Sequence, residues 1–584
     1  MGAWRSSHAP QLLLPHAQMK GVVTLWATRL MCKMKWWRTV LIVGMCVLGI
    51  GLLASAVLPT PQPQVKKQTV MMPMRDGVRL ATDIYFPEGE GPFPVILLRS
   101  PYDRRLGEGI AQDAARRGYV MVVQNTRGRF GSEGKNLPFE TDGWGRLRDG
   151  EDTVEWISKQ PWCNGKIGTW GGSALGITQY LLAGTGTKKI ACQHITVGTP
   201  SLYNSAVYWG GVFRKAMVED WLRISGFSPD ALKIWTSHPT YDAYWRERDM
   251  TTRYRFTNAP AVHIGGWYDI FSQATIDAFV GMQTQGGPGA RGKQKLIMGP
   301  WTHGVFQEKA GELTFPNAKN PPTRAHEMWR WFDHYLKGVD NGVEREPAVT
   351  YYVMGDVTDH HAPGNEWRTA DRWPPVNATP TPFYLHPDKS LSPQKPSEGG
   401  TLSYTYDPKD PVPTIGGPRL TLPAGAMDQR KIEGRPDVLV FTSEPLQEPL
   451  EVTGRVKAVL WASSDAPDTD FAAKLCDVYP DGRSINICEG ILRARFREGF
   501  TKEKLMEPGK VYRFEIDLWS TSIVFNRGHR IRVHITSSNA PAFDPNPNTG
   551  EPFRASERTR PAHNTIYMDT KRPSHILLPV VRGR

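Results

Sequence analysis

The sequence predicts an α/β fold in its first half, interrupted by a helical insertion, and an all-β sandwich in its second half. Between residues 70 and 190, short apolar runs typical of strands alternate with helix-like stretches. Residues 200–256 instead carry aromatic and aliphatic side chains at helical spacing. Beyond residue 346, short strand-like runs are separated by turns of Pro, Gly, Asn and Asp.

Composition and charge exclude several classes of protein. The 584 residues are 40% hydrophobic and 10% aromatic with six cysteines, which excludes a disordered chain and a disulfide scaffold. The net charge is +13, but residues 1–64 supply six basic side chains and no acidic one, which leaves +7 for the rest. That excess is spread out without a dense Lys/Arg block, so no nucleic-acid partner is expected.

Residues 1–64 are predicted to be a signal peptide or membrane anchor followed by a spacer. Residues 40–58 carry no charge and follow a basic stretch. The small residues Ala54-Ser55-Ala56 favour cleavage after Ala56, whereas an uncleaved run of this length is long enough to anchor the chain in a bilayer. The true start is either Met1 or Met34. We expect the body of the protein to be secreted or periplasmic, or anchored to a membrane by residues 40–58.

The first folded domain is predicted to span residues 65–345 around a mostly parallel sheet, with a helical cap inserted at about 200–256. Strands are expected at 95–98, 119–123, 167–170, 261–264 and 295–298, and helices at 109–117 and 151–160. A closing helix carries Trp331 and Phe332. His326 and Glu327 precede it, but Arg330 stands where the zinc motif HExxH requires its second His, so no metal site is expected.

The second domain, residues 346–584, is predicted to be a β-sandwich of the jelly-roll, galactose-binding-like kind. Its strand-like runs include 455–461 and 530–535, and no convincing helix separates them. Cys476 and Cys488 flank a Tyr479-Pro-Asp-Gly482 turn signal, which predicts that they face each other across a hairpin. Either they form a cross-strand disulfide, or they are two small buried hydrophobic side chains.

A glycine-flanked serine is the strongest local signal of chemistry. Ser173 follows a predicted strand and precedes a helix-like stretch, with Gly171 and Gly172 before it and Gly176 after it. A nucleophile at a tight strand-to-helix turn exposes its hydroxyl above the sheet, and the crowded turn needs glycines nearby. The spacing departs by one residue from G-x-S-x-G. The alternative is an ordinary glycine-rich turn.

A serine nucleophile needs a general base and a group that orients that base. Asp269 and His303 each lie just after a predicted strand. The resulting order of Ser173, Asp269 and His303 is the one expected for an α/β-hydrolase domain.

Together the motifs resemble those of the cocaine esterase and X-Pro dipeptidyl-peptidase family of serine hydrolases, over nearly all of residues 68–584. The matching motifs, in order, are Arg75-Asp-Gly-Val78, Arg99-Ser-Pro-Tyr102, Gln124-Asn-Thr-Arg-Gly-Arg129, Gly131-Ser-Glu-Gly134, Asp152-Thr-Val-Glu-Trp156, Gly266-Trp-Tyr-Asp269, Gly299-Pro-Trp-Thr-His303, Asp477-Val-Tyr-Pro-Asp-Gly482, Gly490-Ile-Leu-Arg-Ala-Arg495 and Asn546-Pro-Asn-Thr-Gly550.

The resemblance implies the roles of five residues. Ser173 would be the nucleophile, His303 the general base and then acid, and Asp269 the orienting carboxylate. The oxyanion hole would combine the Tyr102 hydroxyl with the backbone N–H of Ala174. Close relatives of cocaine esterase often carry Tyr after the serine, so Ala174 predicts a differently shaped acyl pocket.

The resemblance also bears on the substrate. Family members that hydrolyse α-amino acid esters place acidic residues just after the triad Asp, whereas residues 270–273 here are Ile, Phe, Ser and Gln. We therefore expect a neutral or apolar acyl group. The residues expected to bind substrate are Trp209, Phe213, Trp267 and Phe271. Tyr208, Trp209, Phe213 and Trp221 are expected either to line the site as a lid or to form the core of that lid.

The prediction is a secreted serine hydrolase that cleaves a small-molecule acyl ester or amide through an acyl-enzyme, without a metal or other cofactor. An X-Pro dipeptidyl-peptidase and a β-lactam side-chain acylase are the alternatives on the same scaffold. A protein that binds a glycan or polymer without catalysis is the alternative from another class. A homodimer is compatible with the sequence, and a membrane partner is expected only if the N-terminal segment stays uncleaved.

Overall fold

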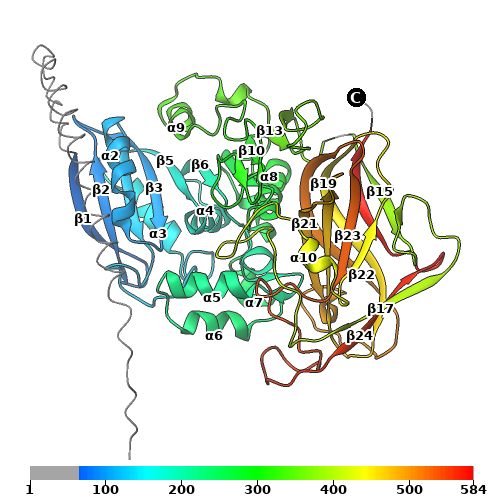
Figure 1. Ribbon diagram of the computed structural model, residues 1–584. Coiled ribbons are helices and arrows are strands. Elements are labelled where there is room, and N and C mark those ends of the chain that lie inside the picture. The colour runs from blue at the N-terminus through cyan, green and yellow to red at the C-terminus, as the bar shows by residue number, and fades with distance from the viewer. Residues whose placement is uncertain (1–64, 376, 583–584) are drawn as a thin grey trace, which may run out of the picture. The chain divides into compact units, whose positions relative to one another are not determined.

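The computed structural model describes residues 65–375 and 377–582, which form an α/β layer, a cap and an all-β domain (Figure 1). The predicted signal peptide or anchor, residues 1–64, lies outside the described residues. Among the helices of the described ranges, none is both long and apolar enough to cross a membrane.

The α/β layer is built on a ten-stranded mixed sheet. Its strands, in spatial order, are β1 (Lys66–Pro73), β2 (Arg79–Phe86), β4 (Val120–Asn125), β3 (Phe93–Ser100), β5 (Cys163–Gly172), β6 (Ile190–Thr196), β9 (Ala261–Gly266), β10 (Gln294–Gly299), β13 (Val349–Val353) and β14 (Glu366–Ala370). The strands from β4 to β13 run parallel, and the antiparallel strands β1, β2 and β14 lie at the two edges.

Helices cover both faces of the sheet, because consecutive side chains of each buried strand point to opposite faces. The helices are α2 (Glu108–Arg116), α3 (Asp149–Ser158), α4 (Ala174–Gly184), α8 (Ser272–Gln285) and α9 (Met328–Lys337), with short 3₁₀ turns at Arg104–Gly107 and Val343–Arg345. Helices α2 and α9 pack on one face, where Trp331 and Phe332 are buried. Helices α3, α4 and α8 pack on the other. The predicted α/β fold is confirmed.

The cap follows β6 and is less regular than predicted. It consists of a π-helix (Leu202–Val207), a hairpin of β7 (Tyr208–Trp209) and β8 (Val212–Phe213), helices α5 (Lys215–Ile224), α6 (Asp230–Ser237) and α7 (Ala243–Arg246), and 3₁₀ turns at Met250–Thr252 and Tyr254–Phe256. Residues 212 and 213 were predicted to be helical, but Gly210 and Gly211 have positive φ and turn the chain into the hairpin. The Gly-Gly pair is a turn signal that the helical periodicity obscured.

The α/β sheet extends beyond the boundary predicted at residue 345. Strand β13 pairs in parallel with β10, and β14 pairs antiparallel with β13, so the sheet ends at Ala370. The first strands of the segment predicted to be all β therefore complete the α/β layer. A small hairpin of β11 (Lys309–Ala310) and β12 (Leu313–Thr314) lies in the connection between β10 and α9.

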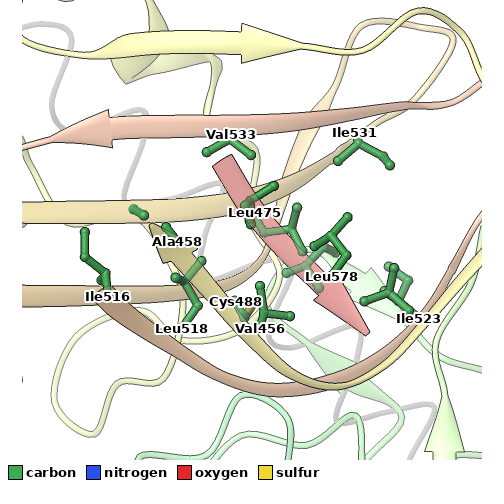
Figure 2. Packing of buried hydrophobic residues seen from close by; sticks show 14 of the residues in the cluster. Val456, Ala458, Leu475, Cys488, Ile516, Leu518, Ile523, Ile531, Val533 and Leu578 are labelled. Atoms are coloured by element: carbon green, nitrogen blue, oxygen red, sulfur yellow. The ribbon is translucent and has the colours of Figure 1, made fainter. Parts of the chain in front are cut away.

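The all-β domain is a sandwich of two antiparallel sheets. One contains β16 (Leu391–Ser392), β15 (Ala378–Leu385), β25 (His575–Val581), β19 (Leu450–Ser464), β24 (Ala562–Met568), β17 (Gly400–Tyr406) and β22 (Tyr512–Phe525). The other contains β18 (Leu439–Thr442), β23 (Arg530–Thr536), β20 (Asp470–Val478) and β21 (Ser484–Arg493). Figure 2 shows aliphatic side chains of the two sheets packed together, for example Val456 and Leu578 against Leu475 and Val533. One short helix, α10 (Arg430–Glu433), and a 3₁₀ turn at Ala494–Phe496 interrupt the strands.

The predicted hairpin of Cys476 and Cys488 forms, but the disulfide does not. Strands β20 and β21 pair across the turn, with a bulge that sets Cys488 opposite Leu475 and Cys476 opposite Asn486. Neighbouring residues of a strand point to opposite faces, so the bulge separates the two thiols. Both are free and buried, which matches the alternative of two small buried hydrophobic side chains.

Candidate active site

Ser173 occupies a strained turn between β5 and α4. Its φ of 57° and ψ of −124° are rare for a residue with a side chain. The turn is held by the Ser173 N–H, which donates to the Thr196 carbonyl of β6 over 2.9 Å. This backbone lifts the serine hydroxyl out of the sheet at the start of a helix, as a nucleophile turn requires.

The glycines around Ser173 are needed for close approach. Gly171 has a φ of 140°, and a Cβ there would lie 2.6 Å from the Cβ of Leu175. A Cβ on Gly176 would lie 3.1 Å from the Cα of Gly198, where α4 packs against the end of β6. The sequence pattern around the serine therefore reflects a crowded strand-to-helix turn.

The structure brings His303 and Asp269 to Ser173 from the ends of β10 and β9. His303 Nε2 lies 2.9 Å from Ser173 Oγ, and His303 Nδ1 lies 2.6 Å from Asp269 Oδ1. The two contacts fit a neutral imidazole that donates from Nδ1 and accepts the serine proton at Nε2. The carboxyl ends of parallel strands meet at one edge of the sheet, which explains why residues far apart in sequence converge here.

Asp269 is fixed and shielded from water. The side chain is fully buried, whereas that of His303 is 17% exposed. The second carboxylate oxygen accepts the Phe271 N–H over 3.0 Å, and the Phe271 ring meets the His303 ring edge to face at 5.9 Å. The turn after β9 therefore orients both the carboxylate and the imidazole.

One candidate donor follows the serine in the chain, and a second contacts the wall of the serine's pocket. Ala174 is the first residue of α4, so its N–H has no acceptor within the helix. The hydroxyl of Tyr102 lies 2.9 Å from the indole nitrogen of Trp221, a residue that lines the same pocket as Ser173. Burial raises the pKa of Tyr102 above its ordinary value, so the phenol keeps its proton at neutral pH.

An apolar pocket opens beside Ser173 and Ala174. Its remaining lining residues are Phe139, Ile177, Ala206, Met217, Val218, Trp221, Trp235, Ile270, Phe271 and Leu420. No carboxylate is among them, so an ammonium group placed there would lose its hydration without gaining a partner. We call this set of residues the apolar pocket.

Of the four residues predicted to bind substrate, only Phe271 lines the apolar pocket. Trp209 is 3% exposed and stacks on Trp519 of the all-β domain with ring centroids 3.6 Å apart. Phe213 is fully buried within the cap, where it packs against Tyr208. The β7–β8 hairpin turns both side chains toward the interior and the all-β domain, as expected if they belong to the core of the lid.

Trp267 also faces away from the apolar pocket. Its indole N–H donates to the Tyr352 carbonyl of β13 over 2.8 Å, and its ring packs against Trp373 at 5.6 Å. Trp209 lines a different, larger cleft between the cap and the all-β domain, together with Gln273, Asp277 and Arg455 among others. Neither tryptophan reaches Ser173.

Several pocket residues had no clear signal in the sequence. Phe139 lies in the long connection between β4 and α3, and Trp235 lies on α6 of the cap. Leu420 comes from the all-β domain, in a loop that a Gly417–Gly425 bridge closes and a Gly311–Ala426 bridge ties to the α/β domain. Trp221 was predicted only as a residue of the lid, and the structure places it in the pocket wall.

The described residues contain no group of three or more His, Cys, Asp or Glu side chains arranged to hold a metal ion. His326 and Glu327 precede α9, and the His326 carbonyl faces the His194 ring.

Comparison with known families matches two profiles that together cover most of the chain. The profile of the X-Pro dipeptidyl-peptidase (S15 family) matches residues 76–232 and 223–305. The profile of the X-Pro dipeptidyl-peptidase C-terminal non-catalytic domain matches residues 341–577.

Individual relatives agree with these profiles. A cocaine esterase of Rhodococcus sp. (strain MB1 Bresler) is 34% identical over 88% of this chain and 98% of its own. A solved α-amino acid ester hydrolase superposes with a TM-score of 0.73 at 27% identity, covering 90% of this chain and 99% of its own. An aminopeptidase from a marine sediment archaeon, Thaumarchaeota archaeon, also has a TM-score of 0.73, at 26% identity over 91% of this chain and 99% of its own.

Proposed function

The chain belongs to the cocaine esterase and X-Pro dipeptidyl-peptidase (S15) family of serine hydrolases, and we propose that it hydrolyses esters of neutral, apolar carboxylic acids through an acyl-enzyme on Ser173. The observation that carries the proposal is the chain of short contacts from Ser173 Oγ through His303 to Asp269, at 2.9 Å and 2.6 Å. At Ser173, these contacts end in the apolar pocket, whose lining carries no charged side chain.

Acylation begins at the serine hydroxyl. Ser173 Oγ attacks the ester carbonyl carbon while His303 Nε2 takes the hydroxyl proton, so the imidazole becomes positively charged. Asp269 stabilises that charge through the Nδ1–H bond. The carbonyl oxygen becomes an oxyanion, and the Ala174 N–H and the Tyr102 O–H donate to it.

The intermediate then collapses and the enzyme is regenerated. The ester bond breaks, His303 returns its proton to the leaving alkoxide, and the acyl group stays on Ser173 Oγ. A water molecule repeats the sequence, with His303 as base, and releases the carboxylic acid. The proton that leaves with the alcohol is replaced from the water molecule, whose proton passes through His303 to Ser173 Oγ when the acid is released.

The apolar pocket supports an uncharged acyl group. Its lining is aliphatic and aromatic, with Ile270 and Phe271 at the positions directly after Asp269. An α-amino acid ester or an X-Pro dipeptide carries an ammonium close to the scissile carbonyl, and this pocket provides no carboxylate to pair with it. A simple acyl ester therefore fits the pocket better than either of these substrates, and an amide of an apolar acid is the second candidate.

Burst kinetics test the proposal. The full chain is mixed with p-nitrophenyl acetate, butyrate and octanoate, and with Ala-Pro-p-nitroanilide, beside its Ser173→Ala variant. We expect a burst of p-nitrophenol from the esters that disappears in the variant. Turnover of the anilide alone would indicate a dipeptidyl-peptidase, and an ester burst that persists in Ser173→Ala would contradict the assignment of the nucleophile.

We also propose that the enzyme acts outside the cytoplasm, where residues 1–56 would direct it. The support is the uncharged run at 40–58 that follows basic residues. N-terminal sequencing of the protein from a periplasmic or culture fraction should give Val57. Recovery of the intact N-terminus from the cytoplasm would contradict the proposal. Light scattering on the same sample tests whether the protein is a homodimer.

A further inference from the structure

Trp221 donates a hydrogen bond to the side chain proposed to stabilise the oxyanion. Its indole Nε1 lies 2.9 Å from the Tyr102 hydroxyl oxygen. An indole N–H can only donate, so the tyrosine oxygen accepts this bond and keeps its own proton for another partner. Within residues 65–375 and 377–582, no protein group accepts that proton. The Tyr102 hydroxyl is thus held by one bond and free to donate one more.

The backbone of Tyr102 is held independently of the indole. Its carbonyl accepts a bond of 2.5 Å from the side chain of Asn125, and its N–H donates to Ser100 Oγ over 3.0 Å. Arg129 donates to the preceding carbonyl, that of Pro101, over 2.7 Å. These bonds fix the backbone from which the Tyr102 side chain projects, and the indole of Trp221 holds its hydroxyl end.

Trp221 itself is held by stacking. Its ring lies parallel to Phe139 at 5.8 Å and 4°, and parallel to Trp235 at 6.2 Å and 7°. Phe227 packs on it at 4.9 Å. A donor held so firmly fixes the direction from which Tyr102 receives its bond, and therefore the direction left for the tyrosine proton.

We propose that Trp221 is a positioning residue that orients the Tyr102 hydroxyl toward the oxyanion formed on Ser173. The inference rests on the proposed esterase function. A hydroxyl whose oxygen already accepts a bond is a stronger donor, and one with a fixed rotation pays no reorganisation cost in the transition state. Trp221 lies on α5 of the cap and in the wall of the apolar pocket. The cap thus takes part in oxyanion stabilisation as well as in acyl recognition.

A double-mutant cycle tests the inference on the full chain. Trp221→Phe removes the N–H donor, and 3-benzothienylalanine at position 221 removes it while keeping the shape of the ring. We expect either change to lower kcat about 3- to 10-fold for p-nitrophenyl acetate and butyrate alike, with KM nearly unchanged. Tyr102→Phe should lower kcat by about 10² to 10³. In the Tyr102→Phe background, the change at position 221 should cost less than about twofold.

Leu420→Ala is the matched control, because it changes the wall of the same pocket from the loop of the all-β domain and removes no ring from the stack that holds Trp221. Its effect should be the same in both backgrounds and should depend on acyl length. Equal losses from Trp221→Phe with and without Tyr102, or a loss mainly in KM that grows from acetate to butyrate, would overturn the inference. An unchanged kcat in Tyr102→Phe would also overturn the inference. The proposed esterase function would still hold in that case if the burst disappears in Ser173→Ala.

Discussion

The side chains at the carboxyl edge of the α/β sheet lie at strand ends, whereas much of the wall of the apolar pocket is formed by the cap and by a loop of the all-β domain. At the edge, Ser173, Asp269 and His303 each lie in a turn whose backbone is set by a buried strand. In the pocket, Trp221 comes from α5 and Leu420 from a loop of the all-β domain. Apart from Trp221, which also contacts Tyr102, the walls should determine selectivity and the edge the chemistry, since changes in the other wall residues need not disturb the edge.

The strongest test of this separation is Asp269→Asn. The amide cannot compensate an imidazolium and favours the wrong tautomer of His303, so kcat should fall by about 10⁴ for every ester, whatever its acyl length. Stopped-flow and steady-state assays with acetate, butyrate and octanoate esters measure this.

Asp277→Asn is the matched control for Asp269→Asn. Asp277 lies on α8 after the same strand but lines the larger cleft with Arg455, away from Ser173. Its activity should stay within about twofold of wild type. A loss that depends strongly on acyl length in Asp269→Asn would show that the edge and the pocket are not separate.

Trp209→Ala is expected to affect stability without affecting selectivity. The Trp209 ring is buried against Trp519, so its removal should lower the free energy of unfolding by about 3–5 kcal/mol. Because Trp209 does not line the apolar pocket, the ratio of octanoate to acetate activity should stay at the wild-type value. Chemical denaturation and ester assays measure the two effects, and a changed ratio would place Trp209 at the substrate after all.

Leu420→Ala is expected to affect selectivity without affecting stability. Truncation enlarges the apolar pocket from the side of the all-β domain and should raise the octanoate-to-acetate ratio about tenfold. The control is Leu422→Ala, two residues further along the same loop, which packs near Trp209 and Trp519 and away from the pocket. If both variants shift the ratio equally, the loop acts through its overall position and not through Leu420.

The smallest expected effect concerns pH and the contact between the two domains. His529 is buried between Asp477 at 2.9 Å and Asp356 at 3.1 Å, the latter in the connection from β13 to β14. Burial lowers the pKa of His529, but the bonds to the two carboxylates outweigh it and raise the pKa above its ordinary value.

The stabilisation that protonated His529 gives the folded protein is fully present below the ordinary histidine pKa. It is lost as the pH rises through the raised pKa of His529 in the folded state. The destabilisation by His529→Gln should therefore be largest near pH 6 and shrink toward pH 9, with ester selectivity unchanged. Thermal denaturation across this pH range checks it, with exposed His361→Gln as control. A destabilisation that grows with pH would contradict the sign.

The sequence predicts the carboxyl edge of the sheet better than the walls of the apolar pocket. The convergence of Ser173, Asp269 and His303 at the carboxyl edge was predictable, because strand ends and glycine-flanked turns leave local patterns and these residues follow strands in a known order. The pocket walls were not, because helical periodicity says that Trp209 and Trp221 are buried but not against what. The hairpin that separates their environments was signalled only by Gly210-Gly211. For Leu420, no local pattern links its loop to a pocket in the other domain.

The central claim is that Ser173 forms an acyl-enzyme with an apolar acid. Acid quenching during turnover of p-nitrophenyl butyrate, followed by peptide mass spectrometry, tests it most directly. The account predicts one butyryl group on the peptide that carries Ser173, and none in Ser173→Ala. A butyryl group on another residue, or turnover without any acylated peptide, would contradict the account.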